Sequence, residues 1–135
     1  MSDKIFINLA VSDLAKSRAF YTGLGFTLNP KFSNNSAASV TISEHIHIML
    51  LTKPFFASFT PRPVADTLAS VGVINCLSFN SRAEVEALIQ KAHRAGASSP
   101  MPPKDHGFMY QHGFEDPDGH VWEAFYMDES KFPGA

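Results

Sequence analysis

The chain contains two similar segments, each with the pattern of a short strand, a polar helix start, an amphipathic helix and a glycine. The first segment covers residues 7–26 and the second covers residues 75–97, with Gly25 and Gly96 in corresponding positions. Two copies of one strand–helix unit predict two half-modules, each too small to bury its own core. When two such units pack together, the cleft between them is a natural place for a small molecule.

Composition narrows the classes of function. The 135 residues are 44% hydrophobic and carry a net charge of −2, which indicates one folded domain and favours neither nucleic acid nor an anionic membrane as partner. The longest apolar stretch, residues 46–51, is too short to span a bilayer, and residues 1–4 lack the apolar core of a secretion signal. A single cysteine, Cys76, excludes an internal disulfide. We therefore expect a cytoplasmic protein.

Hydrophobic periodicity and turn signals predict an α+β fold. Strands are expected over residues 4–11, 27–32, 38–42, 46–52, 73–79, 108–114 and 121–126, and helices over about 13–24 and 82–95. The predicted order is βαβββ, a connection, and βαβββ. We expect one domain over residues 1–128, made of half-modules at about 4–52 and 73–127, and a loose tail over residues 129–135. The aromatic and proline-rich connection is expected to hold one helical turn at residues 55–59.

Two signatures at opposite ends of the chain resemble the vicinal oxygen chelate superfamily, which includes glyoxalase I, bleomycin-resistance proteins and extradiol dioxygenases. They are Leu9-x-Val11-x-Asp13-Leu14-x-x-Ser17-x-x-Phe20-Tyr21-x-x-Leu24-Gly25-Phe26 and Phe114-x-Asp116-Pro117-Asp118-Gly119-His120-x-Trp122-Glu123. The resemblance covers nearly the whole chain. It implies two βαβββ modules whose curved mixed sheets form an open, barrel-like cavity. It also implies glyoxalase-like (lactoylglutathione lyase-like) or dioxygenase-like chemistry, or small-molecule binding.

The resemblance also locates four metal-ligand positions, one on each of four strands. These positions hold Phe6, Met49, Ile74 and Glu123. Phenylalanine and isoleucine cannot bind a hard or borderline ion, and a thioether suits only soft ions. We therefore expect no cofactor and no tightly bound metal. A displaced divalent-metal site that uses His47 is the alternative.

Glu123 is the candidate catalytic residue, because every neighbour in the segment 121–126 is apolar. An apolar setting suits a carboxyl group to general acid or base work. The alternative is a carboxylate that only makes a structural hydrogen bond or ion pair. The turn at residues 116–119 is interpreted as structural, since it fixes the register of the strand that carries Glu123.

Strand alternation predicts which side chains accompany the four implied positions. His47 shares a face with Met49, and Asn8 shares a face with Phe6. Cys76 shares a face with Ile74. Its stronger interpretation is a small buried core residue, because no basic neighbour activates the thiol.

Further substrate-binding candidates come from the late strand and the connection. Tyr110 and His112 share one strand face, where Tyr110 could orient a polar group of a substrate; for His112 a site role and a surface role remain equally open. Phe55 and Phe59 form a lid or pocket wall, or else ordinary core.

Three functional hypotheses follow. The leading one is binding or transformation of a small organic molecule in an apolar cavity without a tightly bound metal, by a homodimer. The second is a metal-dependent glyoxalase-like lyase or dioxygenase-like enzyme that uses Glu123 with His47 or His112. The third is an interaction module without a ligand.

Overall fold

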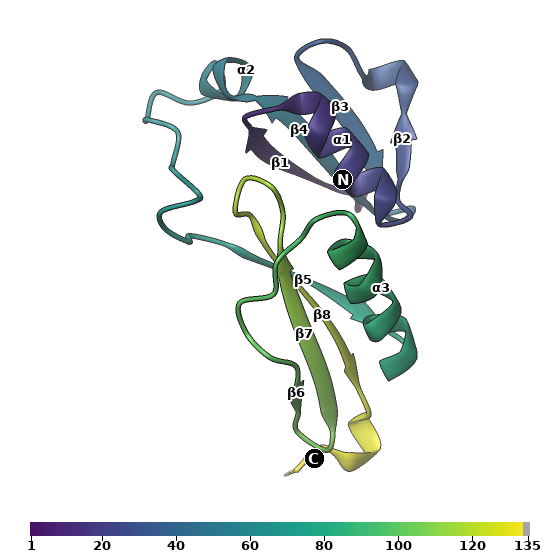
Figure 1. Ribbon diagram of the computed structural model, residues 1–135. Helices are drawn as coiled ribbons and strands as arrows, with labels where there is room; N and C mark the ends of the chain where they lie inside the picture. The colour runs from purple at the N-terminus through teal and green to yellow at the C-terminus, as the bar shows by residue number, and fades with distance from the viewer. Residues whose placement is uncertain (134–135) are drawn as a thin grey trace. The chain divides into compact units, whose positions relative to one another are not determined.

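The computed structural model describes residues 1–133, which divide into two compact units. The first comprises residues 1–70 and the second begins at Val71. Each unit is a four-stranded mixed sheet with a helix on one face (Figure 1), so the α+β fold and the βαβββ repeat are confirmed.

The first unit has the strand order β1-β4-β3-β2, in which β1 pairs parallel to β4 and the other neighbours are antiparallel. Its elements are β1 (Ile5–Val11), α1 (Leu14–Gly23), β2 (Thr27–Asn29), the 3-10 helix η1 (Pro30–Phe32), β3 (Ala37–Thr41), β4 (Ile46–Thr52) and α2 (Lys53–Ala57). Asp13 caps α1 by accepting a hydrogen bond from the Lys16 amide at 3.1 Å. Gly25 follows the helix with a φ of 94°, a conformation that favours glycine.

Alternation along the strands separates a core face from an open face in this sheet. Side chains on the α1 face form the core, among them Leu9, Val11, Val40, Ile48 and Leu50. The opposite face carries Phe6, His47 and Met49, all at least partly exposed. Helix α2 contacts β1 and β4.

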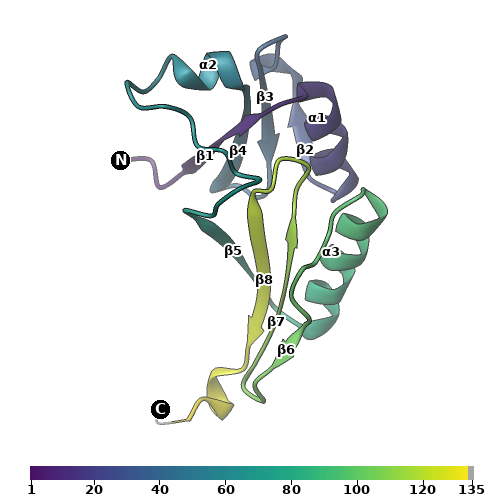
Figure 2. The same ribbon diagram turned by 60° about the vertical axis from the view of Figure 1, so that its left-hand side comes forward.

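The second unit repeats the same arrangement with the order β5-β8-β7-β6, and β5 pairs parallel to β8. Its elements are β5 (Ile74–Phe79), α3 (Arg82–Arg94), β6 (Lys104–Asp105), β7 (Met109–Glu115), β8 (Val121–Met127) and the 3-10 helix η2 (Glu129–Lys131). In both views α3 lies along one face of the sheet (Figures 1 and 2). Trp122, Phe114 and Ala124 are buried with the apolar stripe of α3, which includes Val85 and Leu88.

Local signals define both ends of α3. The Ser81 hydroxyl accepts from the Glu84 amide at 3.2 Å, and the Glu84 carboxylate accepts from the Asn80 amide at 2.9 Å. At the other end the Ala97 amide donates to the Ala92 carbonyl, a Schellman pattern around Gly96, whose φ is 100°. The predicted helix over residues 82–95 is therefore confirmed within one residue.

Three sequence-based expectations differ from the structure by more than one residue. The strand predicted over residues 27–32 ends at Asn29, because Pro30 has no amide hydrogen to donate and begins η1. The helical turn of the connection begins at Lys53 rather than Phe55. The tail predicted to be loose contains η2, and the ring of Phe132 packs edge-on against Phe108 at 5.0 Å. The part of that prediction on residues 134–135 lies outside the described residues.

Within residues 1–133 no helix has the length and apolar character needed to cross a membrane.

Candidate functional site

Strand pairing in the second unit places Glu123 at the centre of the face that α3 does not cover. Glu123 pairs with Cys76 of β5 on one side and with Gly113 of β7 on the other. Directly paired residues point to the same side of a sheet. Gln111 stands two residues from Gly113 on β7 and therefore points to the same face. Lys104 of β6 pairs with Gln111 and shares that face as well.

The carboxylate of Glu123 has the Cys76 thiol as a neighbour, with Sγ and Oε2 3.9 Å apart. Desolvation raises the pKa of the Cys76 thiol, and the negative charge and hydrogen bond of Glu123 raise it further. The thiol is therefore protonated at neutral pH and is a weak nucleophile. Cys76 is exposed, so its interpretation as a buried core residue is wrong.

A cavity of about 170 Å³ lies beside Glu123, between β7, β8 and the segment that leads into β6. Its apolar wall is formed by Pro100, Met101, Pro102, Phe114 and Val121, and its polar wall by Lys104, Gln111, His112, Glu115 and Glu123, with Gly113 between them. An apolar wall with a few polar groups is typical of sites for small organic molecules.

Hydrogen bonds hold the proline-rich segment at its first end. The Ser99 hydroxyl donates to the Gly113 carbonyl at 2.6 Å, and Nε2 of His93 lies 2.6 Å from the same hydroxyl oxygen. The Ser99 hydroxyl donates its only proton to the Gly113 carbonyl, so Nε2 of His93 must be the donor in the bond to Ser99. Residues 100–102 therefore begin from a fixed point on β7.

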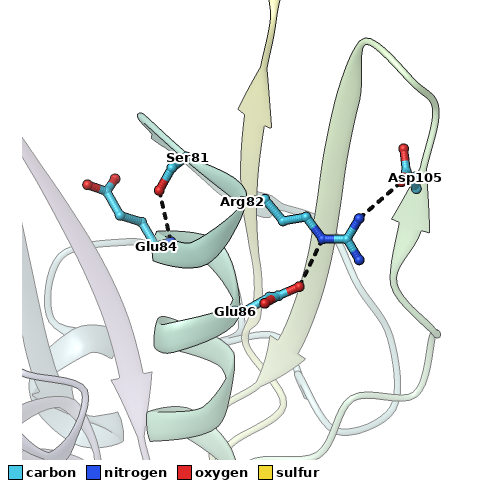
Figure 3. Close-up of polar contacts among 5 residues, drawn as sticks. All are labelled: Ser81, Arg82, Glu84, Glu86 and Asp105. Carbon is cyan, nitrogen blue, oxygen red and sulfur yellow. Dashed lines mark hydrogen bonds and ion pairs between the residues drawn. The ribbon is translucent and has the colours of Figure 1, made fainter.

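Arg82 holds the second end of the segment through β6. Its guanidinium donates to Glu86 at 2.9 Å and to Asp105 at 3.1 Å (Figure 3). It also lies over the ring of Tyr110, 4.1 Å from the centroid. Asp105 is adjacent to Lys104, so this contact fixes the backbone from which Lys104 extends to the cavity.

The turn before β8 has the structural role that the sequence predicts. One carboxylate oxygen of Asp116 accepts from the amides of Asp118 and His120 at 2.9 and 2.8 Å, and both aspartates are buried. This turn sets the register that places Glu123 opposite Gly113.

Tyr110 and His112 lie on the α3 face of the sheet, opposite to Glu123. Tyr110 is buried and His112 is half-buried, with its ring 6.3 Å from that of His93 on α3. Desolvation lowers the pKa of His112; the proximity of His93 adds to this, and a hydrogen bond with the Met101 backbone opposes it. His112 nevertheless forms part of the cavity wall.

The candidates of the first unit lie together on the open face of its sheet. Phe6 stacks on His47 with ring centroids 4.7 Å apart, and Asn8 pairs with Met49 in the next row. Both ring nitrogens of His47 have partners at 3.2 Å, Nδ1 with the Thr41 hydroxyl and Nε2 with the Glu44 carbonyl. Nε2 is therefore the donor, and Nδ1 accepts in the neutral ring.

Two aromatic candidates of the connection contact each other, and one apolar candidate stands at the start of β5. Phe55 and Phe59 meet edge-on at 5.1 Å, and both are exposed. Ile74 is also exposed, in the row beside Cys76 on β5.

The donor set around Glu123 does not fit a divalent cation. Its paired neighbours are a glycine and a protonated thiol. Within either unit of residues 1–133, no three histidine, cysteine, aspartate or glutamate side chains come close enough to hold a metal ion.

Sequence reasoning missed the residues of the proline-rich segment and Lys104, Gln111 and Glu115. Lys104 and Gln111 stand in segments interpreted as loop and strand, and only their pairing reveals a shared face with Glu123. Side chains alternate between the two faces of a strand. Had the register of β7 against β8 been known, this alternation would have placed Gln111 and Glu115 on the same face as Glu123.

Several proteins of known structure share this fold. A hypothetical protein, SA1046 from S. aureus, has a structure with a TM-score of 0.79 at 26% identity, covering 93% of this chain and 95% of that one. The antibiotic-binding protein TnmS3 from Streptomyces sp. CB03234 gives a TM-score of 0.65 at 20% identity, over 94% and 97% of the two chains. A lactoylglutathione lyase from Agrobacterium tumefaciens gives 0.69 at 16% identity, over 98% of both chains. No curated protein matches the sequence.

The low identities of the last two show a shared fold and nothing more about chemistry. A family model, by contrast, matches residues 5–124 of the sequence itself, which run from the start of β1 into β8 and include Glu123. The chain belongs to the glyoxalase/bleomycin resistance protein/dioxygenase superfamily.

Proposed function

We propose that this protein binds or transforms a small organic molecule in the cavity beside Glu123, without a tightly bound metal ion. The observation that carries the proposal is the cavity itself. It places the carboxylates of Glu115 and Glu123 beside apolar side chains and next to a segment that hydrogen bonds hold at both ends. A pre-formed wall of this kind lowers the ordering cost of binding a small ligand.

Glu123 is the group that faces the ligand. Its carboxylate has one weak partner, the Cys76 thiol, and it can accept a hydrogen bond or a proton from a bound molecule. If the protein only binds its ligand, Glu123 orients it; if the protein is an enzyme, Glu123 is the general base. The fold is shared with an antibiotic-binding protein and with a lactoylglutathione lyase, so both kinds of role occur among those names.

We further propose that the open face of the first unit contributes to ligand binding. Phe6, Asn8, His47 and Met49 form a mixed aromatic and polar surface, and Phe55 with Phe59 adds exposed aromatic area. Substitution of Phe6 by Ser, compared with Phe32→Ser at another exposed position, tests whether this surface contributes to ligand affinity.

We also propose a cytoplasmic homodimer. Two observations support the dimer: β1 and β5 are edge strands of their sheets, and Ile5 and Ile74 on them are exposed. Light scattering at micromolar concentration tests it, and a monomer mass near 14.8 kDa would contradict it. The single thiol is consistent with a reducing compartment.

A ligand-observed NMR screen of fragments on chelator-treated protein tests the functional proposal. We expect hits that Glu123→Gln weakens and that Glu129→Gln, on exposed η2, leaves unchanged. Elemental analysis of natively purified protein should find well below one metal ion per chain. Stoichiometric metal, with fragment binding only after metal is restored, would contradict the proposal.

A further inference from the structure

The cavity of the second unit contains charged and polar side chains that have no strong partner in the protein. Among residues 1–133, Lys104 forms no ion pair, and no side-chain hydrogen bond joins Gln111 or Glu115 to another residue. Glu123 has only the thiol contact at 3.9 Å.

Several charged side chains of the same unit outside the cavity are paired or capped, while others, such as Lys91 and Glu129, form no ion pair among the described residues. Arg82 bridges Glu86 and Asp105 (Figure 3). The Glu84 carboxylate accepts a hydrogen bond from the Asn80 amide at the start of α3. Asp128 accepts two hydrogen bonds from Ser130. The unpaired groups of the cavity wall share one face of the sheet, so a single ligand can supply partners to all of them.

The two signs of charge lie at different ends of the cavity. Lys104 and Glu123 flank β7 on opposite sides, and their partners Gln111 and Gly113 stand two residues apart on that strand. This spacing separates their backbones by roughly 7 Å along the strand and roughly 10 Å across the sheet. Glu115 lies a further two residues along, on the Glu123 side of the cavity. The apolar side chains of Met101 and Pro102 also line the cavity.

From this arrangement we infer that the ligand of the proposed site is a zwitterion with an apolar body between its charges. Its cationic amine is held by Glu123 and Glu115, its carboxylate is held by Lys104 and the Gln111 amide, and its body lies against Met101 and Pro102. The inference rests on the proposed function and names the class of molecule that the cavity selects.

Matched six-carbon probes test the inference: 6-aminohexanoate, hexanoate, hexylamine and hexan-1-ol, each titrated by NMR at low salt. We expect 6-aminohexanoate to bind most tightly. Lys104→Met should weaken it roughly tenfold, to the level of hexylamine, and Glu123→Gln should weaken it to the level of hexanoate, because each removes a charge-assisted hydrogen bond. Lys91→Met and Glu129→Gln, at exposed positions outside the cavity, are the matched controls, and amide spectra verify folding of each variant.

The outcomes separate the two levels of the proposal. If hexan-1-ol or a singly charged probe binds the cavity as tightly as 6-aminohexanoate, the zwitterion inference is overturned and the small-molecule site stands. Unchanged affinity of Lys104→Met for 6-aminohexanoate would also overturn the zwitterion inference and leave the site standing. If none of the four probes shifts the amide signals of the lining residues, both the inference and the proposed site are contradicted.

Discussion

Gly113 lies directly opposite Glu123 in the β7–β8 pair, and a side chain on Gly113 would crowd both the Trp122 carbonyl and the Glu123 side chain. A Cβ at Gly113 would stand 2.9 Å from the carbonyl oxygen of Trp122 and 3.3 Å from Cγ of Glu123. Glycine is required here by close approach rather than by backbone conformation. The smallest residue of the sheet therefore makes room for the candidate catalytic carboxylate.

Gly113→Ala should destabilise the fold and displace Glu123. The added methyl group meets backbone in a packed sheet, and overpacking of this kind costs about 1–3 kcal/mol. Urea unfolding measures the loss. Gly72→Ala is the control, because nothing lies within 4 Å of a Cβ at that position. Equal stability of the two variants would show that the sheet absorbs the methyl group and that the close approach has no cost.

Glu123→Gln should increase the reactivity of the Cys76 thiol. Desolvation and then Glu123 raise the pKa of Cys76, so removal of the negative charge lowers that pKa and increases the thiolate fraction at neutral pH. We expect iodoacetamide to modify Cys76 several-fold faster in the variant. A rate below that of the wild type would mean that Glu123 acts as a base toward the thiol. Glu129→Gln is the control for a general change of charge.

The free energy of unfolding should decrease as pH falls below about 6.5, and His112 should account for part of the decrease. Its pKa in the fold is lowered, first by desolvation and then by His93, so the unfolded chain binds the proton more readily. Stability supplied by the neutral ring is complete above the unfolded pKa and is lost as pH falls toward the lowered folded pKa. Urea unfolding across this range should show a flatter dependence for His112→Gln than for the control His106→Gln. An identical slope in both variants would contradict the assignment.

Arg82→Ala should destabilise the fold only slightly, since solvent screens exposed ion pairs and cation–π contacts. Because Arg82 holds Asp105 beside Lys104, the variant should also weaken 6-aminohexanoate several-fold. Arg62→Ala, at an exposed position of the connection, is the control for lost charge. Arg82→Lys separates the effects of charge and geometry, since lysine cannot bridge both carboxylates with a planar fork. Full affinity in Arg82→Ala would show that Lys104 needs no such support.

Local chemistry made much of the fold predictable. Asp13, Ser81, Gly25 and Gly96 each act within a few residues of their own position, at helix ends that the sequence pattern indicates. The Asp116 turn is of the same kind. Such signals depend on hydrogen bonds between near neighbours, which a sequence displays directly.

The candidate site was only partly predictable, because it depends on register and on what covers each face. Tyr110 and His112 are two residues apart, as the sequence shows, but only the pairing of Ala124 with His112 places them opposite Glu123. The exposure of Cys76 depends on what covers its side of β5, which no local pattern records. Lys104 reaches the cavity through a two-residue strand too short to leave a periodic signal.

A crystal structure of the protein with its best-binding fragment tests the central claim most directly. The account predicts that the ligand contacts the Glu123 carboxylate and Met101 in the cavity of the second unit, with no metal ion between ligand and protein. A ligand that touches neither Glu123 nor the segment 100–104, or one held by a metal ion, would contradict it.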